Sequence, residues 1–147
     1  MKIILLVFSF IWQLPQNIVA LILLLIWRKR SQISSYKGCY AYTVYNFSAG
    51  VSLGNFCFVG RFYEEAPDVL YPYVLHEMKG HGYQSRLLGP LYLIVIGIPS
   101  FIHAKLCKDD DLYYNFYTER WANKIAGIYY DTKNHILVYE DKIVKET

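Results

Sequence analysis

Two histidines and a glutamate stand close together in the segment HEMKGH, residues 76–81. In the zinc-binding pattern HExxH, the histidines are four residues apart on a helix and hold one Zn²⁺, while the glutamate activates the metal-bound water. Here His76 and His81 are five residues apart, which on a regular helix turns their side chains about 140° away from each other. A shared metal therefore requires a π-bulge between them, and Gly80 makes such a distortion easier.

A catalytic zinc site usually takes three protein ligands and a water, so a third ligand has to come from elsewhere in the chain. Glu119 is the candidate, and Asn123 shares its helix face and is placed to hydrogen-bond a metal ligand. An alternative stays open. On a regular helix Glu77 and His81 face the same way and would give a carboxylate and an imidazole to a metal, which would leave no general base.

Two segments of the chain, HEMKGH and YTERWAN (residues 117–123), together resemble the gluzincin plan. In that plan an HExxH helix is completed by a glutamate from an ExxA(D/N) helix, as in membrane-bound CAAX-type and heat-shock metallopeptidases. The chain also resembles a family of small, uncharacterised bacterial membrane proteins that combine the motifs HExGHxxQS, LGPLYLxVIGxPS and YTExWAN. The end of the first motif stands here at residues 81–85, and the other two stand at 88–100 and 117–123.

The gluzincin likeness implies His76, His81 and Glu119 as zinc ligands and Glu77 as the general base of a membrane-associated zinc metallopeptidase. Its substrate would be a peptide or protein. The additional residue between the histidines changes the spacing of the motif, and the assignments that depend most on this spacing are those of His76 and Glu77. The alternative is a non-catalytic integral membrane protein in which the same residues form a structural polar network.

The N-terminal segment, residues 1–30, has 25 uncharged residues from Ile3 to Trp27 and then the basic cluster Arg28-Lys29-Arg30. A helix of that length covers the roughly 30 Å hydrocarbon core of a bilayer. A cleaved signal peptide is disfavoured because the apolar stretch is too long and the heavier positive charge follows it. We therefore predict a transmembrane helix in a bacterial inner membrane, with the basic cluster and the motif region on the cytoplasmic side.

Polar residues interrupt this helix at Gln13, Gln16 and Asn17, beside Pro15. Polar groups at membrane depth are costly unless they face protein or water, so we expect them to face the rest of the chain. Gln84, Ser85 and Arg86, near the end of the helix that carries the HEMKGH motif, are expected to cap or anchor that helix at the membrane surface, since an arginine side chain can extend to the interface.

Residues 31–147 are predicted to form one membrane-associated domain, and the whole chain a membrane protein that is mainly α with a small β element. Aromatic and β-branched residues predict short antiparallel strands, as a hairpin, over 40–62. The helix with the HEMKGH motif is expected over 69–88, a second apolar segment over 87–106, and the ExxAN helix over 113–126.

The second apolar segment carries a topological constraint. If residues 87–106 crossed the bilayer completely, the two histidines and Glu119 would lie on opposite sides. A shared metal site therefore requires a re-entrant segment that turns at Gly97 and Pro99, or a buried helix packed against the first one.

Composition limits the other function classes. The chain is 54% apolar and only 18% charged, which is richer in apolar residues than a soluble domain needs and makes the lipid bilayer an expected partner. The net charge of +3 and the lack of basic runs interleaved with aromatics argue against nucleic acid. Cys39, Cys57 and Cys107 lack CxxC spacing, so neither a disulfide framework nor a thiolate metal site is indicated.

Overall fold

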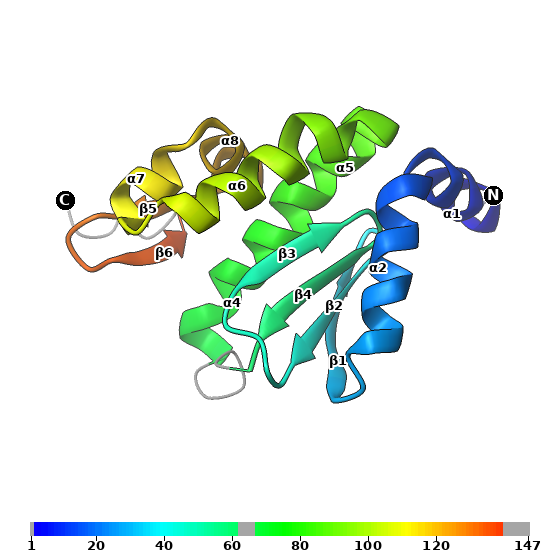
Figure 1. Ribbon diagram of the computed structural model, residues 1–147, viewed down its shortest axis with the longest axis horizontal. Helices are drawn as coiled ribbons and strands as arrows, with labels where there is room; N and C mark the ends of the chain where they lie inside the picture. The colour runs from blue at the N-terminus through cyan, green and yellow to red at the C-terminus, as the bar shows by residue number, and fades with distance from the viewer. Residues whose placement is uncertain (1, 62–66, 140–147) are drawn as a thin grey trace.

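The computed structural model describes residues 2–61 and 67–139 and combines helices with two small β-sheets (Figure 1). At this level the predicted architecture, mainly helical with a small β element, is confirmed. The last residue of the predicted 40–62 hairpin and the end of the C-terminal tail, residues 140–147, lie outside the described ranges.

The N-terminal apolar segment is two helices, so the prediction of one helix over residues 3–27 is wrong. Helix α1 (Lys2–Trp12) and helix α2 (Leu14–Ile26) meet at Gln13 with an angle of 92° between them. Pro15 lies in the first turn of α2, where a proline is tolerated because its nitrogen would have no helical partner. The bend therefore falls where the polar residues interrupt the apolar sequence.

A four-stranded sheet follows, with strands β1 (Arg30–Tyr36), β2 (Cys39–Val44), β3 (Gly50–Leu53) and β4 (Phe56–Gly60) in the order β1-β2-β4-β3. Strands are present in the predicted region, but β1 was not predicted, because its sequence RSQISSY is polar on both faces. The pairing of β2 with β4 is parallel, whereas β3 pairs with β4 as an antiparallel hairpin. The prediction of purely antiparallel strands is therefore wrong.

The two faces of this sheet differ in side-chain size, and each face packs against a different helix. Small residues on one face, with Cys39 and Cys57 among them, pack against Val74 and Met78 of the motif helix. Aromatic residues such as Phe58 on the other face pack against Ala20 and neighbouring residues of α2. Side chains alternate between the faces of a strand, so the pattern CYAYTV of β2 serves both packings. The sheet lies between the N-terminal helix and the motif helix (Figure 1).

The motif helix is continuous in direction but changes type along its length. It consists of α4 (Pro67–Leu75), the π-helix η1 (His76–His81) and α5 (Gly82–Leu88). The short 3₁₀-helix η2 (Gly89–Leu91) then begins a reversal into the π-helix η3 (Leu93–Gly97) and α6 (Ile98–Leu106).

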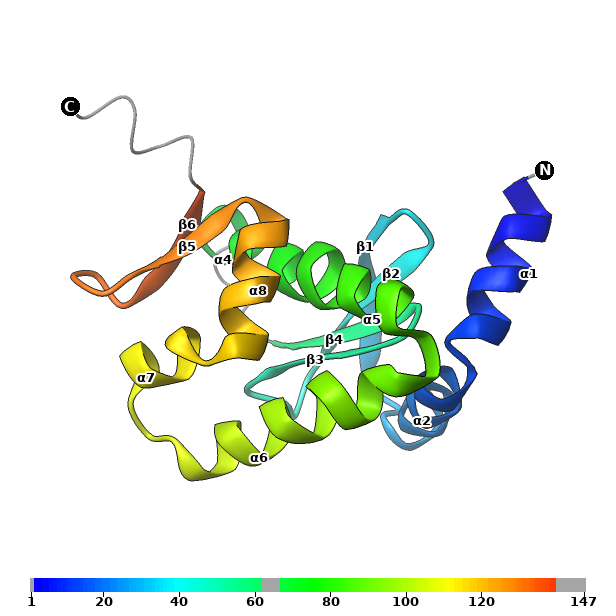
Figure 2. The same ribbon diagram turned by 90° about the horizontal axis from the view of Figure 1, so that it is seen from above.

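The chain turns between Gly89 and Leu93, so the alternative with a turn at Gly97 and Pro99 is wrong. The other alternative, a buried helix, is also wrong, because no residue of α6 is buried. The segments Tyr71–Leu91 and Leu93–Leu106 lie at 119° to each other, and α6 runs back toward α8 (Figure 2). Gly89 has a φ of 53°, and a Cβ there would lie 2.3 Å from the ring of Trp12. Only glycine fits at this turn, because both the backbone conformation and the space exclude a side chain.

The C-terminal part begins with two helices where one was predicted over 113–126. Helix α7 (Asp110–Asn115) and helix α8 (Tyr117–Ala126) are separated by Phe116, whose backbone is extended. Gly127 ends α8 in the left-handed conformation, and the hairpin of β5 (Ile128–Asp131) and β6 (Ile136–Tyr139) follows.

No single helix within the described ranges is both long and apolar enough to cross a membrane. Two bent pairs reach the required length and composition together, namely α1 with α2 and the motif helix with η3 and α6.

A buried polar network holds the bend of the N-terminal helices against the rest of the fold. The side-chain amide of Gln16 donates to Ser85 Oγ at 3.0 Å and to the Gly89 carbonyl at 2.9 Å. Asn17 Oδ1 accepts the backbone N–H of Asn55 at 2.8 Å, and its Nδ2 donates to Asn55 Oδ1 at 3.1 Å. The expectation that these polar residues face the rest of the chain is confirmed.

Replacing Asn17 with alanine should therefore destabilise the fold, because the buried N–H of Asn55 would lose its acceptor. We expect the free energy of unfolding in detergent to fall by about 1–3 kcal/mol. Ile18→Ala is the matched control, since Ile18 is the next residue on α2 and its side chain is half exposed. Equal losses in the two variants, measured by denaturant titration, would contradict a structural role for the network.

Candidate metal centre

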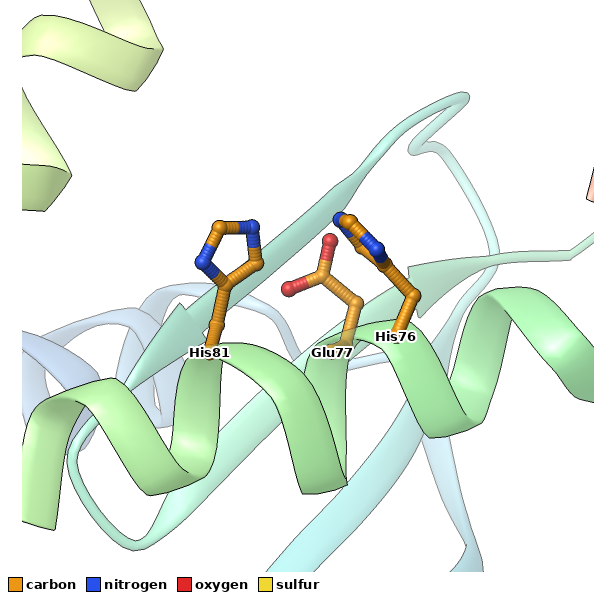
Figure 3. Close-up of side chains that lie close together, drawn as sticks. All are labelled: His76, Glu77 and His81. Carbon is orange, nitrogen blue, oxygen red and sulfur yellow. The ribbon is translucent and has the colours of Figure 1, made fainter. Parts of the chain in front are cut away.

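The π-helix η1 coincides with the HEMKGH segment, residues 76–81. A π-helix forms i→i+5 hydrogen bonds, so residues five apart take the places that residues four apart take in an α-helix. The bulge that a shared site requires is therefore present. The side chains of His76, Glu77 and His81 project from the same side of η1 (Figure 3), and each offers a ligand atom within 4.8 Å of the others. The regular-helix alternative, which paired Glu77 with His81 alone, does not apply to this backbone.

Glu119 of α8 meets both histidines. Its Oε2 atom lies 3.0 Å from Nε2 of His76 and 3.3 Å from Nε2 of His81, and the Glu119 side chain is fully buried. Glu119 can reach the two histidines because α8 lies very close to η1. A Cβ on Gly80 would lie 2.6 Å from the backbone oxygen of Ala122, so glycine at this position lets α8 lie directly on η1.

The distances from Oε2 of Glu119 to the two imidazole nitrogens are compatible with a zinc ion, and Glu77 offers a second carboxylate within 4.8 Å of the histidines. Tetrahedral ligands about 2.0–2.1 Å from Zn²⁺ are roughly 3.3 Å from one another. The two nitrogen-to-oxygen distances of 3.0 and 3.3 Å are close to that value, so a metal would need the ligands to separate only slightly. The set of two imidazoles and one carboxylate is also a donor set that zinc uses in catalytic sites.

Each imidazole is hydrogen-bonded through Nδ1, on the side of the ring away from Glu119, and these bonds set its tautomer. Nδ1 of His81 lies 2.7 Å from Oε1 of Gln84, and Gln84 Nε2 donates to the Thr118 carbonyl at 2.9 Å, which sets the orientation of that amide. Nδ1 of His76 lies 2.7 Å from Oδ1 of Asn123. Each Nδ1 therefore carries a proton for its amide oxygen, which leaves Nε2 with a lone pair in the neutral ring. Asn123 occupies the supporting position predicted for it.

Three electron-pair donors thus converge on one buried point, and such an arrangement needs a cation. Without a metal, a proton takes this place. Burial lowers the pKa of His81, but the carboxylate of Glu119 outweighs burial and raises that pKa to about 9. Burial likewise opposes ionisation of Glu119, yet the two imidazoles hold its pKa well below the usual range. The pocket is electrostatically suited to a positive charge.

The second oxygen of the Glu119 carboxylate is held away from the histidines. Oε1 accepts hydrogen bonds from Ser100 Oγ at 2.6 Å and from Thr118 Oγ1 at 2.8 Å. Oε2 alone is therefore directed at the two imidazoles, which is the arrangement of a monodentate metal ligand. Ser100 belongs to α6, so the second apolar segment takes part in the site.

Glu77 differs from the other acidic group of the site because it is buried but not fully bonded. Its carboxylate atom Oε2 has no hydrogen-bond partner among the described residues. A Cβ on Gly50 would lie 2.2 Å from Glu77 Oε1, so the carboxylate lies directly against the start of β3. Ser52 Oγ of β3 donates a hydrogen bond to the Glu77 carbonyl at 2.8 Å and so holds the backbone of η1 against β3. This placement leaves an acceptor free for a water or a metal.

Four supporting residues were not predicted in these roles. Gln84 and Ser85 were expected at a membrane surface, but both are fully buried, one orienting His81 and the other bonded to Gln16. The spacing of Gln84, three residues after His81 on one helix face, was a signal for its role. Thr118 adjoins Glu119 in the sequence, whereas no local pattern points to Ser100.

Removing the extra residue tests the interpretation of η1. Lys79 is only partly buried and bonds through Nζ to the Ala126 carbonyl at 2.9 Å, whereas Met78 is fully buried in the core. Deleting Lys79 leaves HEMGH, which has HExxH spacing, so we expect a regular helix with zinc affinity within about tenfold of wild type.

Lys79→Ala is the matched control for this deletion, since it removes the same side chain and keeps the π-helix. Both variants should bind zinc in a competition assay with a chromophoric chelator. Loss of zinc binding in the deletion alone would show that the site depends on the π-helix itself.

The chain was also compared with protein-family models, with curated proteins and with solved structures. None of these comparisons finds a match. The resemblance to gluzincins therefore stays a prediction, and the chemistry of the site rests on its own geometry.

Proposed function

We propose that this protein is a membrane-associated zinc peptidase in which His76, His81 and Glu119 hold the metal and Glu77 is the general base. The observation that carries this proposal is the convergence of two Nε2 atoms and one carboxylate oxygen, at 3.0 and 3.3 Å, with each imidazole oriented by an amide oxygen. The resemblance to the gluzincin plan and to the family of small bacterial membrane proteins supports the same assignment.

Zinc in this position would polarise a peptide carbonyl and lower the pKa of a water beside it. The role of Glu77 is to accept a proton from that water while the water oxygen forms a bond to the carbonyl carbon. Glu77 then gives the proton to the peptide nitrogen, the carbon–nitrogen bond breaks, and a carboxyl group and an amine are released. Its unpartnered oxygen is the feature that suits it to carry this proton.

The edge of the sheet supports a peptide as the substrate. Strand β3 is at the end of the sheet order, and the Ser52 carbonyl accepts a hydrogen bond from the Tyr92 hydroxyl at 3.1 Å, on the side away from β4. Because successive residues of a strand point their backbone groups to opposite sides, Gly50 directs its N–H and C=O to the same free edge. An extended peptide that pairs with Gly50 would lie beside Glu77.

Membrane association is supported by apolar surface. Large apolar side chains are exposed along α1, α2 and α6, among them Ile3, Leu25 and Leu106 at 76%, 80% and 77%. The basic cluster at residues 28–30 follows α2 directly. We propose that these helices insert into the bacterial inner membrane from the cytoplasmic side, and their bends of 92° and 119° suit shallow insertion better than a straight crossing.

The alternative is a non-catalytic membrane protein in which the same residues link η1 to α8. Oε2 of Glu119 lies within hydrogen-bond distance of Nε2 of both histidines, which favours this alternative, because protonated imidazoles would satisfy the carboxylate without a metal.

Zinc content separates the two proposals. We expect about one zinc per purified chain, and loss of that zinc in His81→Ala and Glu119→Ala, measured by atomic emission. Glu77→Gln should keep the zinc and lower the rate of peptide cleavage by about 10²–10⁴-fold, because a general base contributes that much. Folded protein that binds no zinc at micromolar metal would leave only the non-catalytic role.

Gly50 gives a second test that leaves the ligands untouched. Gly50→Ala places a methyl group in the space of the Glu77 carboxylate, so cleavage should fall at least about tenfold while zinc content stays unchanged. Gly82→Ala is the matched control, since its Cβ would meet its nearest neighbour at an ordinary 3.7 Å. Equal activity of the two variants would exclude Glu77 from the reaction.

A further inference from the structure

Two cavities of different character meet at Glu77. Both are lined by Glu77 and by Gly50, the residue of β3 that faces the free edge of the sheet. The smaller cavity, of about 340 Å³, extends toward α7. Its lining combines Ser48, His76, Lys108, Asp110 and tyrosines with apolar residues such as Val59 and Ala104, and is more polar than that of the larger cavity. The larger cavity, of about 560 Å³, extends in another direction, between α2 and α6.

The larger cavity is apolar beyond the site itself. Residues of α2 and the following loops form one side, and residues of η3 and α6 form the other. Its apolar lining includes Leu23, Trp27, Phe47, Leu93, Ile98 and Phe101. Its volume lies within the range of roughly 300–1,000 Å³ that ligand sites in proteins occupy. Lys105 and, at the site itself, His81 are the basic side chains among the residues that line it.

The walls of the apolar cavity continue onto the exposed apolar surface of the protein. Val19, Ile98 and Phe101 line the cavity and yet are 38%, 53% and 63% exposed. The same surface is the one proposed above to contact lipid. An apolar segment can therefore pass from the bilayer into the cavity without crossing water, which would be costly for it.

Gly50, at the start of the edge strand β3, lies where the two cavities meet. Ser48 lines only the smaller cavity, Ala49 and Gly50 line both, and Phe47, Val51 and Leu53 line only the larger one. A peptide that pairs with Gly50 can therefore extend into the smaller cavity on one side and into the apolar cavity on the other, with the bond between its two flanks next to Glu77.

We infer that the substrate is an amphipathic polypeptide whose apolar flank comes from the bilayer and whose polar flank lies in water, and that it is cut near the junction. This inference rests on the proposed peptidase function. It specifies the substrate class by the chemistry of its two flanks. Cleavage releases a polar fragment and leaves an apolar fragment that can return to the membrane.

Peptide binding by the zinc-loaded Glu77→Gln variant in detergent micelles tests this inference apart from catalysis. Three fluorescent peptides share length and central residues: one has two polar flanks, one has a leucine-rich flank before the centre, and one has that flank after it. We expect one of the two amphipathic peptides to bind at least about tenfold more tightly than the polar peptide, measured by anisotropy.

Two substitutions on α6 show whether the cavity is responsible. Ile98 lines the cavity and Ile102 does not, although they are 53% and 50% exposed on the same helix. Ile98→Asn should remove most of the preference, whereas Ile102→Asn should retain it. Phe101→Ser, which also changes the cavity wall, serves as the second variant if Ile98→Asn does not fold.

The outcomes distinguish the inference from the function on which it rests. Equal binding of all three peptides, or equal effects of Ile98→Asn and Ile102→Asn, would overturn the inference while zinc binding and cleavage of the polar peptide stood. If free fatty acid displaces the amphipathic peptides and the central residues contribute nothing to their binding, the cavity holds lipid. That result would also overturn the inference. Absence of zinc and of all cleavage would instead refute the peptidase proposal.

Discussion

The carboxylate of Glu119 is buried, and two imidazole nitrogens point at one of its oxygens. The electron pairs of these three groups repel one another, and the surrounding structure has to hold the groups together. The distances of 3.0 and 3.3 Å can be maintained only if a cation, a proton or a metal, lies among the three groups. The supporting hydrogen bonds all act on this arrangement. Asn123 and Gln84 orient the two histidines, and Ser100 holds the second carboxylate oxygen.

Packing around the site follows from the same need for close approach. Gly80 removes the side chain that would separate η1 from α8, and Gly50 lets the Glu77 side chain lie against β3. Small residues of β2 and β4 let the motif helix pack closely on the sheet. The polar network at Gln16 and Asn17 attaches α2 to the end of the motif helix and to the β3–β4 turn. The N-terminal helices are thus part of the framework that positions the site, in addition to their exposed apolar surface.

The residues that the structure brings together at the candidate centre could be predicted from the sequence better than the path of the backbone between them. His76, His81, Glu119 and Asn123 were found because helical spacing and donor chemistry are local properties. The bend at Gln13 and the reversal at Gly89 were missed, since an apolar composition fits a straight helix equally well. The parallel pairing of β2 with β4 depends on contacts across the sheet, which no single strand encodes.

X-ray absorption spectroscopy of the zinc-loaded protein tests the central claim most directly, because it reports the ligand set of the metal without requiring a substrate. We expect a four-coordinate zinc with two imidazole nitrogens and oxygen ligands at about 2.0–2.1 Å. A sulfur ligand at about 2.3 Å, or a shell of oxygens without imidazole, would contradict the assignment of His76, His81 and Glu119.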